Sequence, residues 1–310
     1  MNELENTTNT AQQASIQAWS QESSRLTQWT LERLVNRTDI YRIYRPMSHR
    51  QDDLCNSLTL PWKEREQIPG TLTSTIIEKH YQDSSHSNLI GLYAISAECT
   101  CKWFMIDIDQ VRCNWLVSTK IAAIAWWEDL RGQGFRPLLL ETNGISNGSY
   151  HLLVCLSEAI SSQRLHAFVS RMVKDFGKYG LRQIPSVCPN DPEINEYRPD
   201  GSWWRLPGRH HTREFWTRVW DGSRWLENQE AIEAILGVSG DSPDLIPCDN
   251  DSSVSTGQGQ GSTAQFARFL LAEGFEPIDV EDFAVRWDST QNQPPRNEAD
   301  IREIVRDLVQ

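Results

Sequence analysis

The chain has 310 residues, of which 39% are hydrophobic and 23% charged, so it has enough apolar material for a globular core. These proportions exclude collagen, a continuous coiled coil and disorder over the whole length, and no run reaches the ~18 apolar residues of a membrane span. The net charge of −12 belongs entirely to residues 227–310, which hold 17 acidic and 5 basic residues. With no export signal ahead of seven cysteines, we expect a cytoplasmic protein with reduced thiols and no membrane association.

Hydrophobic spacing predicts the following elements in chain order. Residues 1 to about 20 are polar and predict a frayed terminus, followed by a helix that closes near residue 37. The next expected elements are a helix at 73–80, strands at 89–95 and 103–109, a helix at 117–131, strands at 137–141 and 150–156, a helix at 161–179, a strand at 202–206 and a hairpin at 215–226. Three short helices are expected at 264–272, 280–287 and 298–308.

This mixed order predicts an α+β fold with a central, mostly antiparallel sheet. Residues 237–262 are rich in Gly, Ser and Asp and predict a flexible linker. The expected organisation is therefore a polar and helical extension, a main domain, the linker and a small helical module, at 1–37, 38–236, 237–262 and 263–310.

Two acidic residues, Asp107 and Asp109, end the strand predicted at 103–109. Side chains two residues apart lie on the same face of a strand, so both carboxylates project together and away from Ile106 and Ile108. Carboxylates this close repel unless a cation or proton lies between them, and such oxygen ligands suit Mg²⁺ or Mn²⁺. A solvated strand end is the alternative.

A serine and a histidine share one face at the start of the strand predicted at 150–156. Ser149 and His151 follow Gly148, which permits the close approach of a phosphate. A hydroxyl and an imidazole that face a pair of carboxylates suit the binding of a triphosphate. The alternative is a hairpin turn with a buried histidine.

A basic and aromatic turn follows in the sequence WWRLPGRHH, which begins at Trp203. Proline and glycine fix a bend with cationic groups on both sides. Guanidinium groups bind phosphate oxygens and indoles can stack on bases. A tryptophan-stabilised surface hairpin is the alternative. The candidate residues here are Arg205, Arg209, His210 and His211.

In this order, the strand-borne Asp-x-Asp, the Ser-x-His and the Arg-Leu-Pro-Gly turn resemble the motifs of the archaeo-eukaryotic primase superfamily. Segments 71–109, 143–154 and 203–225 look like the primase domain of transposon-associated (TOTE) conflict systems and its bacterial relatives. Residues 269–308 are similar to the small helical primase C-terminal module. The resemblance implies an α+β primase-polymerase core with an RRM-like sheet flanked by helices.

The resemblance also implies a DNA primase or polymerase that performs template-directed nucleotidyl transfer, in a replication, mobile-element or defence context. Asp107 and Asp109 match the metal-binding pair, which takes two divalent ions, Mg²⁺ or Mn²⁺. Ser149, His151 and Arg205 match residues that bind the incoming triphosphate, with Arg209, His210 and His211 near its phosphates. The implied partners are nucleoside triphosphates, a single-stranded DNA template or primer-template, and a separate helicase or nuclease.

One departure from the family pattern concerns the third carboxylate, because Ser186 stands where the family has an acid. Asp191 or Glu193 would have to replace it as a metal ligand, or the site is degenerate. A non-catalytic nucleic-acid-binding module of the same fold is therefore the main alternative, and a metal-dependent nuclease is a third. Zinc is not expected, because nothing near Cys99, Cys101 and Cys113 completes a tetrahedral set.

Overall fold

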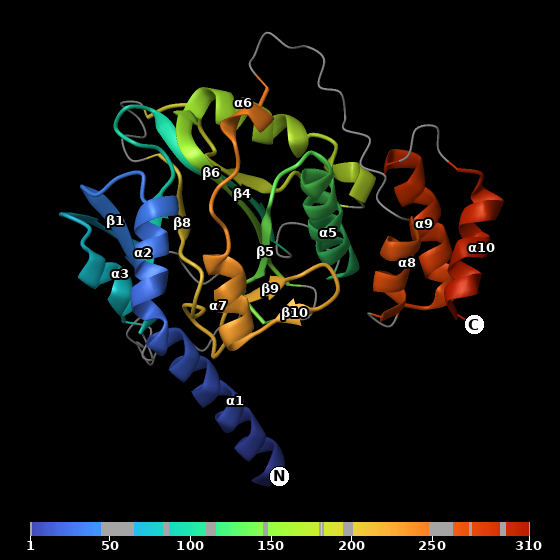
Figure 1. Cartoon of the computed structure of the whole chain (residues 1–310), viewed down its shortest axis with the longest axis horizontal. Coiled ribbons are helices and arrows are strands. Elements are labelled where there is room, and N and C mark those ends of the chain that lie inside the picture. Colours follow the sequence, from blue (N-terminus) through green and yellow to red (C-terminus); the bar gives the residue numbers. More distant parts are fainter. Residues whose placement is uncertain are drawn as a thin grey trace, which may run out of the picture.

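The structure of the protein is a computed structural model with two antiparallel sheets, the larger one in the middle of the molecule and the smaller one toward one side (Figure 1). It describes residues 2–44, 65–82, 87–109, 116–144, 148–179, 181, 183–194, 201–247, 263–272, 275–291 and 296–309. The predicted α+β class with mostly antiparallel strands is confirmed.

The larger sheet has six strands in the order β10-β9-β5-β6-β4-β7, and every neighbouring pair is antiparallel. The strand next to its edge is β4 (Thr100–Ile108), which pairs with β6 (Tyr150–Ser161) on one side and with the edge strand β7 (Ser186–Cys188) on the other. The remaining strands are β5 (Leu138–Glu141), β9 (Arg218–Trp220) and β10 (Trp225–Leu226).

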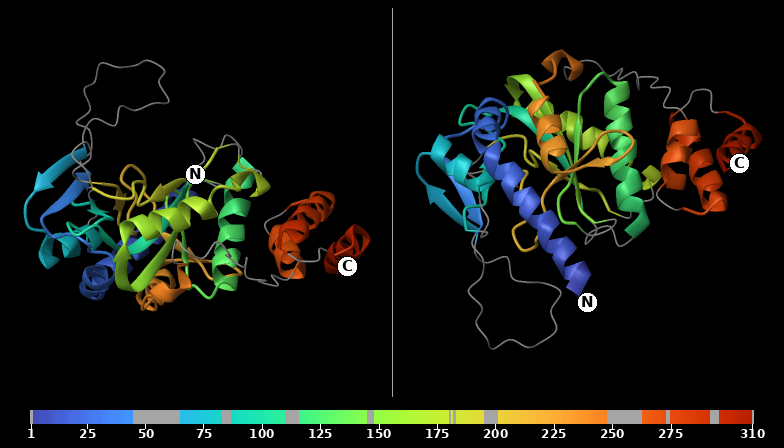
Figure 2. Two further views of the ribbon diagram at one scale, coloured as in Figure 1. Left: turned by 90° about the horizontal axis from the view of Figure 1, so that it is seen from above. Right: turned by 60° about the horizontal axis from the view of Figure 1, so that its bottom comes forward.

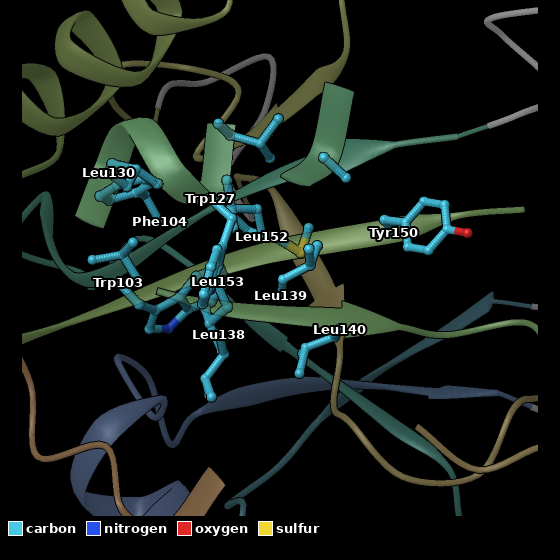
Figure 3. Close-up of a cluster of buried hydrophobic side chains, with 14 of the residues drawn as sticks. Trp103, Phe104, Trp127, Leu130, Leu138, Leu139, Leu140, Tyr150, Leu152 and Leu153 are labelled. Atoms are coloured by element: carbon cyan, nitrogen blue, oxygen red, sulfur yellow. The ribbon is translucent and has the colours of Figure 1, made fainter. Parts of the chain in front are cut away.

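Two helices cover one face of this sheet, namely α5 (Leu116–Gly132) and α6 (Ser162–Met172), and the turn η1 (Phe176–Tyr179) follows α6. Phe104 on β4 contacts Phe168 on α6, with ring centroids 5.7 Å apart. Ile106 and Ile108 are fully buried on the same face of β4. Figure 3 shows buried side chains around the strands of the larger sheet, among them the neighbouring Trp103 and Phe104 of β4. Cys101, Trp103 and Met105, on the same face of β4 as Asp107, are buried as well, so both faces of β4 contribute to the core and Asp107 lies where that burial ends.

The smaller sheet has the order β2-β1-β3-β8. Its strands are β2 (Arg65–Pro69), β1 (Ile40–Tyr44), β3 (Ile90–Tyr93) and β8 (Trp203–Arg205). Beside it, α2 (Ser23–Arg33) packs against α3 (Ser74–Tyr81), which begins where the Thr73 hydroxyl accepts a hydrogen bond from the Ile76 N–H. Trp204 on β8 and Trp103 on β4 join the two sheets, with ring centroids 5.9 Å apart.

The predicted frayed N-terminus is wrong, because residues Asn2–Gln21 form helix α1. Trp19 is completely buried and stacks on Tyr81 and on Trp216, at centroid distances of 6.1 and 5.5 Å. Helix α7 (Asn228–Leu236) also packs against α1. A polar segment is thus held in place by one large aromatic side chain near its C-terminal end.

The predicted linker at 237–262 starts too early, because residues up to 247 are fastened to the main domain. Asp241 pairs with Leu156 in a β-bridge and accepts hydrogen bonds at 2.8 Å from the Arg136 side chain and backbone. A Cβ on Gly240, whose φ is +89°, would lie 2.7 Å from the backbone of Leu156. A short 3-10 turn, η2 (Pro243–Leu245), completes this attachment. Residues 248–262 of the predicted linker lie outside the described residues.

The three C-terminal helices are α8 (Thr263–Ala272), α9 (Pro277–Gln291) and α10 (Glu298–Val309), and they pack against one another, as both views of Figure 2 show. Asp288 is fully buried between them and accepts hydrogen bonds from the Thr263 hydroxyl at 2.5 Å and the Arg296 backbone N–H at 2.8 Å. The predicted helices are confirmed, while the role of this bundle as a primase-type module stays a prediction.

A search of the described helices finds none with the length and hydropathy required to cross a bilayer.

Candidate functional site

Four predicted side chains meet where β4 and β6 lie side by side. Asp107 is directly opposite His151 in the strand register, and its Oδ1 lies 3.5 Å from His151 Nε2. Two residues on, the Ser149 hydroxyl donates a hydrogen bond of 2.9 Å to Asp109 Oδ1. The two carboxylates and their two polar partners therefore form one patch on one face of the sheet.

The patch is open to solvent on one side. The Asp107 side chain is 32% exposed and the His151 side chain 12% exposed, whereas Ile106 and Ile108 are fully buried on the reverse face. Strand alternation thus places Asp107 on the face of β4 opposite Ile106 and Ile108, as the sequence predicts. A ligand can reach the carboxylates while His151 stays largely shielded.

His151 is held in one tautomer by Trp204. The indole Nε1–H of Trp204 donates a hydrogen bond of 2.7 Å to His151 Nδ1. Burial, together with the positive charge of Arg205, lowers the pKa of His151 to about 3. Because the neutral ring then carries its proton on Nε2, His151 presents an N–H toward Asp107 and the open side of the patch.

Arg205 lies beside this patch and is almost completely buried. It donates hydrogen bonds to the backbone carbonyls of Arg209 at 2.8 Å and Thr142 at 3.4 Å. Burial lowers the pKa of Arg205, against the opposing effects of nearby Tyr44 and Asp107. Arg205 therefore both supports the turn that follows β8 and places positive charge near the carboxylates.

The other basic residues of the turn have contacts of their own. Arg209 is buried and its Nη2 donates to both oxygens of Glu214, at 2.6 and 2.5 Å. His210 and His211 lie against each other with ring centroids 4.3 Å apart. Of these three residues, Arg209 is linked to Arg205 through its backbone carbonyl, and the predicted contact of all three with phosphates stays a prediction.

The turn itself is fixed by a histidine that the sequence did not single out. His80 on α3 is fully buried, and its Nδ1 accepts a hydrogen bond of 3.1 Å from the Ile90 N–H. Nε2 therefore carries the proton and donates to the Pro207 carbonyl at 2.9 Å. Gly208 follows with a φ of +134°, and a Cβ there would lie 3.2 Å from His80 Nε2. Nothing in the sequence around His80 signals a partner 127 residues away.

Ser186 occupies the position next to Asp107 on the other side of the strand. In the register of β4 and β7, Ser186 is directly opposite Asp107. His151, Asp107 and Ser186 therefore form a row across three neighbouring strands. The position where the family pattern has its third carboxylate lies at the centre of the site, and in this chain it carries a hydroxyl.

Asp191 and Glu193 are not brought to this patch, so the predicted replacement of the third carboxylate is not supported. Beyond Ser186 the chain runs past Cys188, which is opposite Met105, in the direction away from Asp109. The Pro192 carbonyl then accepts a hydrogen bond from the Ser162 hydroxyl. Ser162 directly follows Ser161, which is opposite Thr100 in the register of β4 and β6. Thr100 lies about 20 Å along β4 from Asp107. Strand direction thus carries both acids toward the far end of the sheet.

The donor set of Asp107 and Asp109 fits a hard divalent cation. Mg²⁺ is commonly bound through one or two carboxylates, with water and substrate phosphates completing the octahedron. Within the described ranges no group of three or more His, Cys, Asp or Glu side chains could hold a metal, so a cation here would depend on phosphate oxygens for further ligands. Of the cysteines considered for zinc, Cys101 is buried, which raises the pKa of its thiol, and Cys113 lies outside the described residues.

No family model and no curated protein matches the chain. Among solved structures, it is similar to the polymerase domain from Mycobacterium tuberculosis Ligase D in complex with DNA. The two sequences are 13% identical, the TM-score is 0.40, and the match covers 76% of this chain and 92% of that one. At this level of similarity, function has to be inferred from the side chains themselves.

Proposed function

We propose that the chain is a nucleotidyltransferase of the primase-polymerase type, which adds nucleotides to a strand paired with a single-stranded DNA template. The observation that carries the proposal is the patch in which Asp107 and Asp109 face Ser149 and His151. Carboxylates for a divalent cation and neutral donors for phosphate oxygens lie within one side chain's length of each other. This combination suits the transfer of a nucleotide from its triphosphate.

In this proposal Asp107 and Asp109 hold the divalent ions, Mg²⁺ or Mn²⁺. Bound there, the metal would neutralise phosphate charge and favour ionisation of the attacking hydroxyl. The hydrogen bond from Ser149 orients Asp109. His151 would donate its Nε2–H to a phosphate oxygen of the nucleotide. The nearby guanidinium of Arg205 adds positive charge where the triphosphate would lie.

The test is a primer-extension assay with purified full-length chain, a primed DNA template, nucleotides and Mn²⁺ or Mg²⁺. We expect metal-dependent extension of the primer, and dinucleotide formation on an unprimed template if the chain also starts strands. A folded protein that yields neither product with either metal contradicts the proposal.

A second candidate, a nucleic-acid-binding module without catalysis, is favoured by one observation. Ser186 stands opposite Asp107 where another carboxylate would help to bind metal. A site with two carboxylates binds a divalent cation more weakly than one with three. Under this alternative, single-stranded DNA binds equally well with and without metal, and no nucleotide is incorporated.

Replacing Trp204 with phenylalanine is expected to weaken nucleotide binding. The change keeps an aromatic ring beside Trp103 but removes the N–H that donates to His151 Nδ1, so both neutral tautomers of His151 become populated. Loss of one such hydrogen bond corresponds to a rise of about fivefold in KM for the nucleotide, with a smaller change in kcat. The nitrogen-15 chemical shifts of the His151 imidazole should change from those of a single tautomer to those of a mixture of two.

Trp103→Phe is the matched control for this variant. It removes a neighbouring indole N–H, which donates to the Leu34 carbonyl and not to His151. Its imidazole signals should stay those of the native protein. A native tautomer in Trp204→Phe would contradict the assigned role of Trp204.

A further inference from the structure

The smaller sheet presents an aromatic and basic face. Strand alternation and register put Arg42 and Tyr44 of β1, Tyr93 of β3 and Trp203 of β8 on the same face, which we call the aromatic face. Residues of the opposite face are buried, namely Tyr41, Ile90, Leu92 and Trp204. Most of the apolar burial in this sheet is thus on the face opposite Trp203, while Tyr93 is buried on the aromatic face itself.

Side chains of the aromatic face are already ordered against one another. Trp203 lies flat over Gly91, where a Cβ would come within 2.6 Å of the indole ring. The Arg42 guanidinium lies 5.5 Å from the Trp203 ring, and its Nε donates a hydrogen bond of 2.8 Å to the Tyr93 hydroxyl. Tyr44 contacts the edge of Trp203 at a centroid distance of 5.5 Å. The glycine is thus what allows a tryptophan to lie across the sheet.

The side chains of the aromatic face differ in their exposure to solvent. Trp203, Tyr44 and Arg42 are partly exposed, whereas Tyr93 is buried beneath them. Ordered, partly exposed rings lose little conformational freedom when a planar ligand stacks on them. Strands β1, β3 and β8 contain no acidic residue, although the whole chain has a net charge of −12. This face is therefore suited to an anionic partner with flat apolar groups.

We infer that the aromatic face binds an unpaired DNA strand by base stacking. Bases of a single strand stack on tyrosine and tryptophan rings, and a guanidinium beside those rings contacts the phosphates. Bases of a duplex are already stacked and paired, so they do not offer their faces to Trp203. A four-stranded sheet with aromatic side chains on its outer face is an arrangement that other proteins use for single-stranded nucleic acid.

Strand β8 links the aromatic face to the candidate site, because Trp204 on its other face donates a hydrogen bond to His151. Arg205, on the same face of β8 as Trp203, lies close enough to Asp107 and His151 to affect their electrostatics. A strand stacked on Trp203 would therefore lie two residues along β8 from the arginine that places positive charge near the carboxylates. That the bound DNA strand is the template rests on the proposed function. Binding of a DNA strand to the aromatic face requires neither metal nor nucleotide.

The experiment measures binding of a labelled 20-nucleotide oligo-dT strand by fluorescence anisotropy, in EDTA and without nucleotide. We expect Trp203→Leu and Tyr44→Leu each to weaken binding about 10-fold, as loss of stacking on one base would. Arg42→Gln should reduce the dependence of the binding constant on salt concentration. Circular dichroism in the near ultraviolet checks that each variant is folded, and Tyr44→Leu keeps the indole ring that lies over Gly91.

Trp225→Leu is the matched control, since Trp225 is also partly exposed but stacks on Tyr150 in the larger sheet. It should bind the strand as the native protein does. Native affinity in both Trp203→Leu and Tyr44→Leu overturns the inference, as does tighter binding of a 20-base-pair duplex than of the single strand. If the native chain binds the strand through Trp203 but incorporates no nucleotide, the aromatic face stands and the proposed catalysis fails.

Discussion

Replacing Asp107 with asparagine is expected to abolish nucleotide addition. Asp107 lies at the centre of the row formed with His151 and Ser186, so its carboxylate is the one that the other polar groups surround. Asparagine keeps the shape but removes the negative charge that holds a divalent cation. A loss of several kcal/mol of transition-state stabilisation corresponds to a rate about 10³-fold lower. Primer extension with Mn²⁺ measures the rate, and titration calorimetry measures metal binding.

Asp191→Asn is the control for that experiment, because it makes the same chemical change at an acid that the fold carries toward the far end of β4. We expect native metal binding and native extension from this variant. Retained activity in Asp107→Asn would contradict the proposed site, and lost activity in Asp191→Asn would contradict the placement of the third acid.

Replacing Ser186 with aspartate is expected to strengthen metal binding. Residues directly opposite in an antiparallel pair have Cβ atoms about 5 Å apart, so the new carboxylate would lie next to that of Asp107. A third anionic ligand should raise the affinity for Mn²⁺ about tenfold and increase the rate of extension at limiting metal. Without metal, three carboxylates repel one another, so the melting temperature in EDTA should fall and recover when Mn²⁺ is added.

The same charge placed elsewhere on the sheet should have no such effect. Ser161→Asp introduces an aspartate at an exposed position at the far end of β6, opposite Thr100. Its metal affinity and its melting temperature in EDTA should match those of the native protein within error. Unchanged metal binding in Ser186→Asp would show that this position does not face the cation.

The strands and helices with strong periodicity were predictable, and so was the shared face of each motif. The alternation of buried Ile106 and Ile108 with Asp107 follows from a period of two alone. The approach of Ser149 to Asp109 depends on the pairing of β4 with β6, which are separated in sequence by α5 and β5. That pairing was implied by the family resemblance and not by local sequence.

Strand β7 and several distant contacts were not predictable, although the short strands β8, β9 and β10 fall where the sequence predicts them. β7 has three residues beside a proline, too few for a periodic pattern, yet it sets the position of Ser186. Helix α1 is held against the main domain partly by the stacking of its Trp19 on Trp216, which lies nearly two hundred residues further along the chain. Residues 237–247 look like a linker in composition, but Arg136 and Leu156 bind Asp241. In each case the decisive partner is remote in the chain.

The alternation along β8 has a practical consequence for protein engineering. Its three residues serve different neighbours, since Trp203 covers Gly91, Trp204 orients His151 and Arg205 supports the turn. A library that randomises this strand would change several properties at once, and selection would favour the native combination. Arg42 and Tyr44 contact Trp203 from β1, so varying them would change the aromatic face without replacing Trp204 or Arg205.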